Sequence, residues 1–284
     1  MDPASTLERQ IPLIWVFACP CWSLKIAGMR RPGAPLLGSA TRRSVRWHAR
    51  AAARTLLDEL APLRCRLCEV VVAGDCALCH VCRGELAVNA SPCVRCALPL
   101  PGATTAIPRH CPACLARPPP FTTASVPYCY DESLAYLIGR WKYHGERALT
   151  RSFAELWLDA MPRPAVPDLL IPVPLHWRRL VRRGFNQSAE LAAQLAAPLG
   201  VLHPLRRPRL RRRVATRAQA RMDRAQRVRN LRGAFDLVGS VAGQHVALVD
   251  DVCTTGATAE AAARALLDSG ATRVDLWCLA RTPP

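Results

Sequence analysis

The chain has 284 residues, and half of them are hydrophobic, which is enough to bury a core in one large domain or two small ones. Lysine and arginine exceed aspartate and glutamate by 18, so anionic partners such as phosphates, nucleic acids or acidic protein surfaces are favoured. No run of about 18 or more apolar residues occurs, and the sequence therefore predicts no transmembrane helix.

The first 61 residues are predicted to be an N-terminal extension that is partly disordered. Residues 1–50 show no clear periodicity and are rich in arginine, proline and tryptophan. An apolar stretch over 11–24 is short and interrupted by two prolines, which makes it a poor signal peptide. Met29, followed by two arginines, begins a more ordinary N-terminus, so we expect the natural start to lie there. Residues 51–61 have the pattern of a short amphipathic helix.

The segment 62–117 contains four pairs of cysteines, each with the spacing C-x-x-C. Two residues between thiolates form a tight knuckle that lets both sulfurs reach one tetrahedral Zn²⁺, so two knuckles complete a site and four complete two. Sequential pairing of the knuckles is expected, with a cross-braced arrangement as the alternative. Because protein ligands fill every position, the sites would be structural. The eight candidate ligands are Cys65, Cys68, Cys79, Cys82, Cys93, Cys96, Cys111 and Cys114.

Two further alternatives exist for the cysteine segment. Redox-active C-x-x-C pairs would require a thioredoxin-like βαβ context, which the pattern around these pairs does not provide. Cys76 or His80 lies close enough in the sequence to replace one of the metal ligands. Metal-binding thiols indicate a reducing compartment, so a cytoplasmic location is expected. The metal-bound module would present a surface to a protein partner or to nucleic acid.

After three prolines at 118–120, the pattern predicts an α/β domain over residues 121–284. Apolar runs predicted as strands alternate with helices, which indicates a mostly parallel sheet flanked by helices. Asn186 or Ser188 would cap the helix that ends before Gly200, and Gly270 would end the last helix. The predicted strands cover 122–130, 168–172, 245–250 and 273–280, and the predicted helices cover 134–141, 151–160, 188–197 and 258–269.

The most informative segment is 245–258, where an apolar strand ends in Asp250 and Asp251 and a loop of small residues opens a helix. In open α/β sheets ligands bind beyond the carboxyl ends of the strands, and a helix N-terminus suits a phosphate. Two carboxylates repel a phosphate but accept hydrogen bonds from a sugar diol. The alternative is a buried strand whose acids cap a helix. The candidate phosphate-binding residues are Thr254, Thr255, Gly256, Ala257 and Thr258.

A second candidate anion site follows the strand predicted at 168–172. Its prolines are expected to fix an extended loop, and four arginines between 178 and 183 then precede the N-terminus of a helix. Arginine donors and a helix N-terminus together suit pyrophosphate, whereas a solvated basic loop is the alternative. The candidate residues of this pyrophosphate loop are Val173, Pro174, Leu175, His176 and Arg183.

The segment 206–232 contains twelve arginines and a single acid, Asp223. Arg217, Arg221 and Arg224 would share one face of a helix. A solvated basic face is the usual explanation of such a charge run, but this density of arginine favours an anionic partner. Single-stranded DNA is one candidate, bound in a salt-dependent way. Aromatic residues are not interleaved with the arginines, so base stacking has little support here.

Five short motifs together resemble the ComF (competence protein F, GntX-like) family of phosphoribosyltransferase-like proteins. The resemblance covers residues 62–284 and implies a type I phosphoribosyltransferase fold with a double zinc ribbon at its N-terminus. The motifs are WKYHG at 141–145, IPVPLH at 171–176, RRGFNQ at 182–187, VDDVCTTGAT at 249–258 and LARTP at 279–283.

The resemblance also implies a ligand and a reaction. Asp250 and Asp251 would hold the ribose hydroxyls of 5-phosphoribosyl 1-pyrophosphate (PRPP) or of a nucleotide, and residues 254–258 would cradle the 5′-phosphate. Mg²⁺ would accompany PRPP, and the two acids would act in transferring the phosphoribosyl group to an acceptor that the sequence does not identify. The alternative is a non-catalytic protein that binds nucleotide or single-stranded DNA in competence-type DNA uptake, with a DNA-uptake helicase or another protein as partner.

Overall fold

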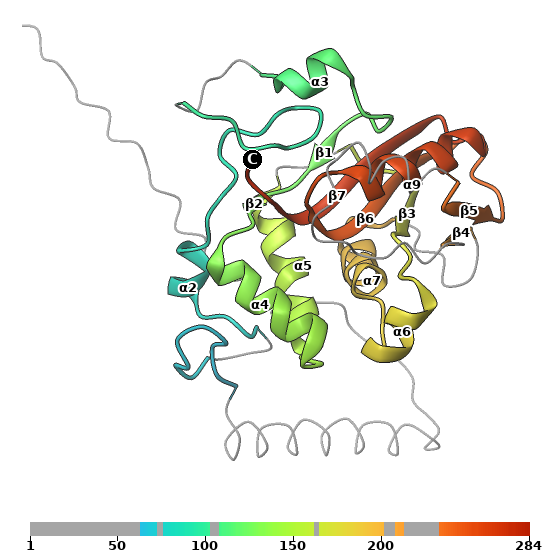
Figure 1. Ribbon diagram of the computed structural model, residues 1–284. Helices are drawn as coiled ribbons and strands as arrows, with labels where there is room; N and C mark the ends of the chain where they lie inside the picture. The colour runs from blue at the N-terminus through green and yellow to red at the C-terminus, as the bar shows by residue number, and fades with distance from the viewer. Residues whose placement is uncertain (1–62, 73–75, 103–107, 162–164, 202–207, 213–232) are drawn as a thin grey trace, which may run out of the picture. The chain divides into compact units, whose positions relative to one another are not determined.

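The computed structural model describes residues 63–72, 76–102, 108–161, 165–201, 208–212 and 233–284 (Figure 1). All of the described residues belong to one compact unit, Ala53–Pro284, which is called the second unit below. The predictions made for residues 1–61, including the helix at 51–61, lie outside the described residues. So do those for the arginines of 213–232.

The sheet of the second unit is parallel, as expected. Its strands are β1 (Ala124–Ser125), β2 (Tyr128–Cys129), β3 (Leu169–Pro172), β6 (His245–Cys253) and β7 (Arg273–Arg281). They are ordered β1-β7-β6-β3, and β2 also pairs with β7. The single strand predicted over 122–130 is wrong in detail. It is split at Val126 and Pro127, and proline has no N–H to donate to a ladder.

Helices cover both faces of the sheet, because successive residues of a strand point to opposite sides. Ala247 and Val249 of β6 pack in one core cluster with α4 (Glu132–Tyr143), α5 (Ala148–Ala160) and α7 (Gln187–Leu199). Val246 and Leu248 pack in the other cluster with α9 (Ala257–Asp268). Figure 1 shows the three helices on one side of the strands and α9 on the other.

The ends of these helices follow from local chemistry. The Asp131 carboxylate accepts a hydrogen bond from the Leu134 N–H at 2.9 Å and caps α4. The Asn186 side chain accepts from the Ser188 N–H at 3.1 Å and caps α7, so of the two predicted caps Asn186 is the one used. Gly200 ends α7 in the left-handed conformation, with φ +64°, as predicted from its position.

Several elements of the α/β domain were not predicted. The arginines expected in an extended loop lie on a helix, α6 (Trp177–Arg183), which the His176 side chain caps and Gly184 ends. The extended backbone set by the prolines therefore stops at His176. A two-stranded antiparallel sheet pairs β4 (Arg209–Arg212) with β5 (Phe235–Val238). Within the described residues, no helix has both the length and the apolarity needed to cross a membrane.

The cysteine segment packs directly on the α/β domain. It contains two short helices, α2 (His80–Gly84) and α3 (Pro112–Ala116). The Ala77 N–H donates to the Ser152 hydroxyl of α5 at 2.8 Å, and Leu78 joins the core cluster beneath that helix. The boundary expected between 117 and 121 therefore does not separate two independent cores.

Candidate functional site

The acid pair lies near the carboxyl end of β6, the strand between β7 and β3. The Ser188 hydroxyl donates to Asp250 Oδ1 at 2.9 Å, and Gln187 Nε2 donates to Asp251 Oδ2 at 3.2 Å. Both donors come from the first turn of α7, which packs against β6. The Asp250 Oδ1 and Asp251 Oδ1 atoms also accept from the main-chain N–H of the residue that follows each acid. The two carboxylates are thus held in fixed orientations before any ligand arrives.

Lys142 supplies a positive charge that sequence reasoning did not assign to the site. Its Nζ lies 2.9 Å from Asp251 Oδ1, and both side chains are largely buried. Arg183 also lies near Asp251, with its guanidinium 5.2 Å from the ring centre of Tyr143. Burial lowers the pKa of Arg183, and the Asp251 charge opposes that change. Lys142 and Tyr143 belong to the WKYHG motif, which was the available signal for both.

Asp250 has an unusual protonation equilibrium. Burial raises the pKa of its carboxyl to about 7, and the neighbouring Asp251 charge acts in the same direction. The Asp251 N–H, the Ser188 hydroxyl and the Lys142 ammonium oppose that rise. Near neutral pH the pair therefore carries less than two full negative charges, which reduces its repulsion of an anionic ligand.

The predicted phosphate-binding residues form a tight bend from β6 into α9. Thr254 is exposed, and Gly256 caps the helix with φ +80°, a conformation that glycine adopts readily. The Thr255 hydroxyl accepts from the Ala257 N–H at 3.4 Å. The first N–H groups of a helix have no acceptor within it, so they are available to an anion. The strand, bend and helix predicted from the sequence are all present.

The start of the predicted pyrophosphate loop lies beside this strand. The Val173 N–H donates to the Val249 carbonyl at 2.8 Å, and Asn186 Nδ2 donates to the Val173 carbonyl. His176 is buried, and burial together with nearby arginines lowers the pKa of its imidazole. Pro174 and Leu175 are partly exposed between them. Arg183 is on the last turn of α6 rather than in the loop, yet it lies near Asp251.

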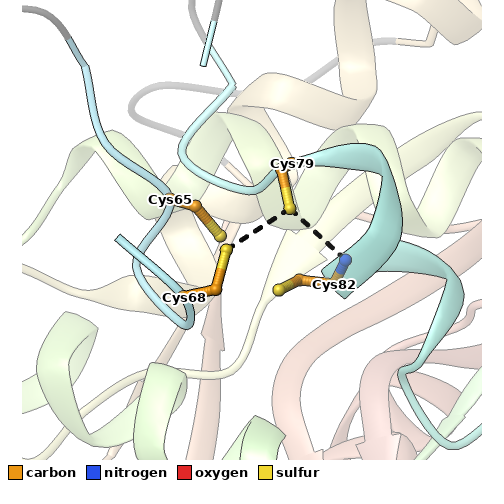
Figure 2. Close-up of side chains that lie close together, drawn as sticks. All are labelled: Cys65, Cys68, Cys79 and Cys82. Carbon is orange, nitrogen blue, oxygen red and sulfur yellow. Dashed lines mark hydrogen bonds between the residues drawn. The ribbon is translucent and has the colours of Figure 1, made fainter. Parts of the chain in front are cut away.

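The eight predicted metal ligands form two groups of four thiols. In each group the sulfur atoms all lie within 4.8 Å of one another. The grouping follows the expected sequential pairing, with Cys65, Cys68, Cys79 and Cys82 in the first group and Cys93, Cys96, Cys111 and Cys114 in the second. Figure 2 shows the first group, with two sulfurs from a loop and two from the start of α2 pointing toward one point.

The geometry of these thiols fits zinc. Four sulfurs at about 2.3 Å from a tetrahedral ion are about 3.8 Å apart. The Cys68 and Cys79 sulfurs are 3.6 Å apart, and the Cys96 and Cys111 sulfurs are 3.7 Å apart. The two groups could therefore hold zinc. Cys76 belongs to neither group, since its thiol points to the Ser152 hydroxyl, and His80 is not part of either one.

Main-chain donors favour the thiolate form of one cysteine in each group, whereas burial raises the pKa of others, such as Cys82 and Cys114. Burial alone would raise the pKa of the Cys65 thiol, but the N–H groups of Cys68, Cys79 and Leu67 more than offset burial and lower that pKa to about 6. Cys93 behaves in the same way, with a pKa lowered to about 6, and the Cys111 N–H donates to its sulfur at 3.2 Å. Thiolates are the form that binds a metal ion.

The parallel sheet, the acid pair on its central strand and the bend into α9 define a phosphoribosyltransferase-like α/β protein. The sequence model described as "Phosphoribosyl transferase domain" matches residues 181–283. DNA utilization protein YhgH of Salmonella typhimurium is 36% identical over 228 residues, which cover 78% of this chain and 98% of that protein.

Competence proteins are also similar to this chain. Competence protein F of Haemophilus influenzae is 34% identical over 183 residues, covering 61% of this chain and 79% of that protein. Competence protein ComFC of Bacillus subtilis is 31% identical over 147 residues, covering 50% of this chain and 57% of that protein. The chain belongs to the ComF family, whose members carry a phosphoribosyltransferase-like domain.

Proposed function

We propose that the α/β domain binds PRPP or a nucleotide at the end of β6 and transfers a phosphoribosyl group to a nitrogen acceptor. The observation that carries the proposal is the acid pair, held by Ser188, Gln187 and Lys142, immediately before a bend that leads into the N-terminus of α9. Carboxylates accept from the ribose 2′- and 3′-hydroxyls, while the N–H groups of residues 254–258 donate to the 5′-phosphate.

The leaving pyrophosphate would lie over the cationic side of the site. Lys142 and Arg183 are near Asp251, and the extended segment of residues 173–176 runs beside β6. When bound with PRPP, Mg²⁺ would neutralise charge on the pyrophosphate oxygens. A lysine and an arginine fixed near the acids add stabilisation as that charge develops in the transition state.

The proposed reaction exchanges one bond at ribose C1 for another. A nitrogen of the acceptor attacks C1, the bond from C1 to the pyrophosphate oxygen breaks, and pyrophosphate leaves with the bonding electrons. The nitrogen then loses a proton to solvent. Asp250 and Asp251 would stabilise the positive charge that develops on the sugar ring, as carboxylates do in other glycosyl reactions.

The binding step is tested by titration calorimetry with PRPP in the presence and absence of Mg²⁺. Replacing both acids by asparagine should weaken PRPP binding by at least about 100-fold, because each charged hydrogen bond to a hydroxyl contributes roughly 1.5–3 kcal/mol. Asp268→Asn is the matched control, since Asp268 is exposed at the far end of α9. Equal PRPP affinity in all three proteins would contradict the proposal.

The transfer step needs a separate measurement. Release of radiolabelled pyrophosphate from PRPP is followed against a panel of nitrogen bases and amines. An acceptor-dependent release that disappears in the double asparagine variant would support a transferase. PRPP binding without release for any acceptor would leave the site as a binding site and contradict catalysis.

A second candidate function is binding of single-stranded DNA, which the surface of α6 favours. Trp177 is 61% exposed and carries Arg178 at 5.3 Å from its ring centre, and three further arginines lie on the same helix. An exposed aromatic ring stacks on bases of any sequence while arginines bind the phosphates. The names of the DNA utilization and competence relatives agree with such a role.

DNA binding is tested with a fluorescent oligothymidylate at two salt concentrations. Trp177→Ala should weaken binding by about tenfold, as expected for the loss of one base stack. Tyr136→Ala is the matched control, because Tyr136 is also exposed and has Arg140 at 5.5 Å from its ring centre, but lies on α4. Equal losses in the two variants would contradict a specific role for α6.

Zinc in both cysteine groups and a cytoplasmic location complete the proposal. Two sets of four thiols at tetrahedral spacing support zinc as the structural ion. A reducing compartment would preserve these thiols for the metal. Native mass spectrometry should find two zinc ions per chain, and a count of zero or of one would contradict this assignment.

A further inference from the structure

Arg281 is the last residue of β7, and its side chain is only 7% exposed. Its guanidinium lies between the bend after β6 and the second cysteine group, two parts of the chain that are far apart in sequence. Nη1 donates to the main-chain carbonyls of Cys253, at 2.8 Å, and of Thr254. Nε donates to the carbonyl of Cys96 at 3.2 Å.

The chemistry of arginine suits this position. A buried guanidinium is costly unless its donors are satisfied, and here they meet carbonyls from the bend, from the cysteine segment and from the strand's own end at Thr282. A planar group with five N–H donors can serve several directions at once, which a single ammonium nitrogen on a flexible stem does not do. Arg281 therefore connects three segments of the chain by hydrogen bonds from one planar group.

The Arg281 side chain binds the bend at its first two residues. Cys253 and Thr254 come immediately before Thr255 and Gly256, so fixing their carbonyls fixes where the following N–H groups point. A small cavity lies at this junction, and its lining includes Cys96, Cys111, Phe121, Cys253, Gly256 and Arg281.

The two cysteine groups differ in what they touch. The first packs against α5, through the hydrogen bond from the Ala77 N–H to Ser152 and the 2.6 Å ion pair of Arg83 with Asp159. The second meets the bend after β6 through the Cys96 carbonyl and Arg281. The second group thus has a hydrogen-bonded route, through one side chain, to the candidate phosphate-binding residues described above.

We propose that Arg281 is a positioning residue that couples the second cysteine group to the phosphate-binding bend at 253–258. A metal ion in that group fixes Cys96, the Cys96 carbonyl orients Arg281, and Arg281 holds the bend. The consequence for phosphate binding rests on the proposed function, whereas the coupling of the cysteine group to the bend does not.

Hydrogen exchange in the metal-loaded, full-length protein without ligand tests the coupling. Arg281→Gln should speed amide exchange in residues 253–258 by about tenfold, since the hydrogen bonds that resist local opening are lost. Zinc content should stay unchanged. Arg95→Gln is the matched control, because Arg95 also donates to a main-chain carbonyl near the second group, that of Pro119, at 2.9 Å. It should leave exchange in 253–258 unchanged.

Two cysteine variants locate the source of the effect. Cys96→Ser should speed exchange in residues 253–258, whereas Cys68→Ser, in the first group, should speed exchange around residues 63–86 instead. If Arg281→Gln does not fold, Arg281→Lys takes its place and should show the same faster exchange. Unchanged exchange in 253–258 in the arginine variant or in Cys96→Ser overturns the proposal.

Titration with PRPP separates this inference from the proposed function. PRPP affinity should fall by about tenfold in Arg281→Gln, in step with the faster exchange of the bend. Faster exchange in a protein whose wild type does not bind PRPP would refute the proposed function and support the coupling. Unchanged exchange with normal PRPP binding by the wild type would do the opposite.

Discussion

Asp250 is proposed to bind the ribose, but burial of its carboxyl lowers the stability of the folded protein when the carboxyl is ionised. Its pKa is raised to about 7 in the folded protein, mainly because the carboxyl is buried, from an ordinary value of 3.8. Between those two pH values the folded protein keeps a proton that the unfolded chain has released. The contribution of Asp250 to the free energy of unfolding therefore decreases as pH rises from about 4 to about 7 and is constant above that range.

Asp250→Asn should remove this decrease in the free energy of unfolding with rising pH. We expect the stability of the variant relative to the wild type to increase as pH rises from 4 to 8, because burial disfavours the carboxylate form of Asp250 and asparagine carries no charge. PRPP binding should weaken at the same time. Urea unfolding of both proteins at the two pH values measures the difference. An equal difference in stability at pH 4 and pH 8 would contradict a raised pKa.

At the scale of single residues, the sequence predicted the parts of the site that are contiguous. Asp250, Asp251 and residues 254–258 were identifiable because strand, acids, small residues and helix follow one another in one run. Ser188 and Lys142 were not assigned, since their roles exist only where α7 and α4 pack beside β6. Local spacing contains no information on which strand a helix will cover.

At the scale of elements, the helices and strands with buried apolar faces were the ones predicted correctly from the sequence. The elements with regular apolar patterns, such as β6, β7, α7 and α9, were predicted to within a few residues. Trp177, Leu180 and Val181 of α6 have the i, i+3, i+4 spacing of a helix, but the helix was missed because the four arginines among them were interpreted as part of a basic loop. The strand β4 was missed for a related reason, since its sequence RLRR has the appearance of a charge run.

Gly256 lies at the boundary between the phosphate-binding bend and α9, and the bend depends on its backbone conformation. A Cβ there would meet only Glu260 Oε1 at 3.9 Å and Cys253 Sγ at 4.0 Å, so space is available and the cost of alanine lies in its φ of +80°. We expect Gly256→Ala to destabilise the protein by about 1–2 kcal/mol. PRPP affinity should fall as well, because the backbone must relax at the helix N-terminus. Calorimetric titration and thermal unfolding measure the two effects.

Gly270 provides the matched control at the other end of α9. Its φ is +95°, and a Cβ would lie 3.3 Å from the Ala242 Cα, so Gly270→Ala should destabilise the fold at least as much. It lies at the opposite end of the helix from the bend and should leave PRPP affinity unchanged. If the two alanine variants lose affinity equally, general destabilisation explains both and Gly256 has no special role.

At the scale of the whole molecule, the cysteine segment and the α/β domain share their cores. Cys65 and Cys82 of the first group lie in the cluster that contains Trp141 and Trp157. Ala97, which follows Cys96 of the second group, lies in the cluster that contains the residues of α9. The C-x-x-C spacing predicted which thiols would gather, but spacing does not determine which surface a module packs against. Each metal site should therefore stabilise one face of the sheet.

Metal removal tests this shared stability. With zinc chelated, each group would lose the ion that holds its four sulfurs together beside the cores, so we expect residues 53–284 to unfold in a single transition at lower temperature. A loss of several kcal/mol corresponds to a decrease in Tm of roughly 10 °C or more for a domain of this size. Differential scanning calorimetry of the protein with and without chelator measures the change.

Two cysteine variants show whether the effect comes from the metal sites. Cys82→Ser, in the first group, should lower the Tm of the zinc-loaded protein toward that of the chelated one. Cys129→Ser should not, since Cys129 lies outside both groups and its thiol donates to the Val88 carbonyl at the long distance of 4.0 Å. If chelation instead produces two transitions and leaves the upper one unmoved, the α/β domain is stable without the cysteine segment. The shared cores would then contribute little to its stability.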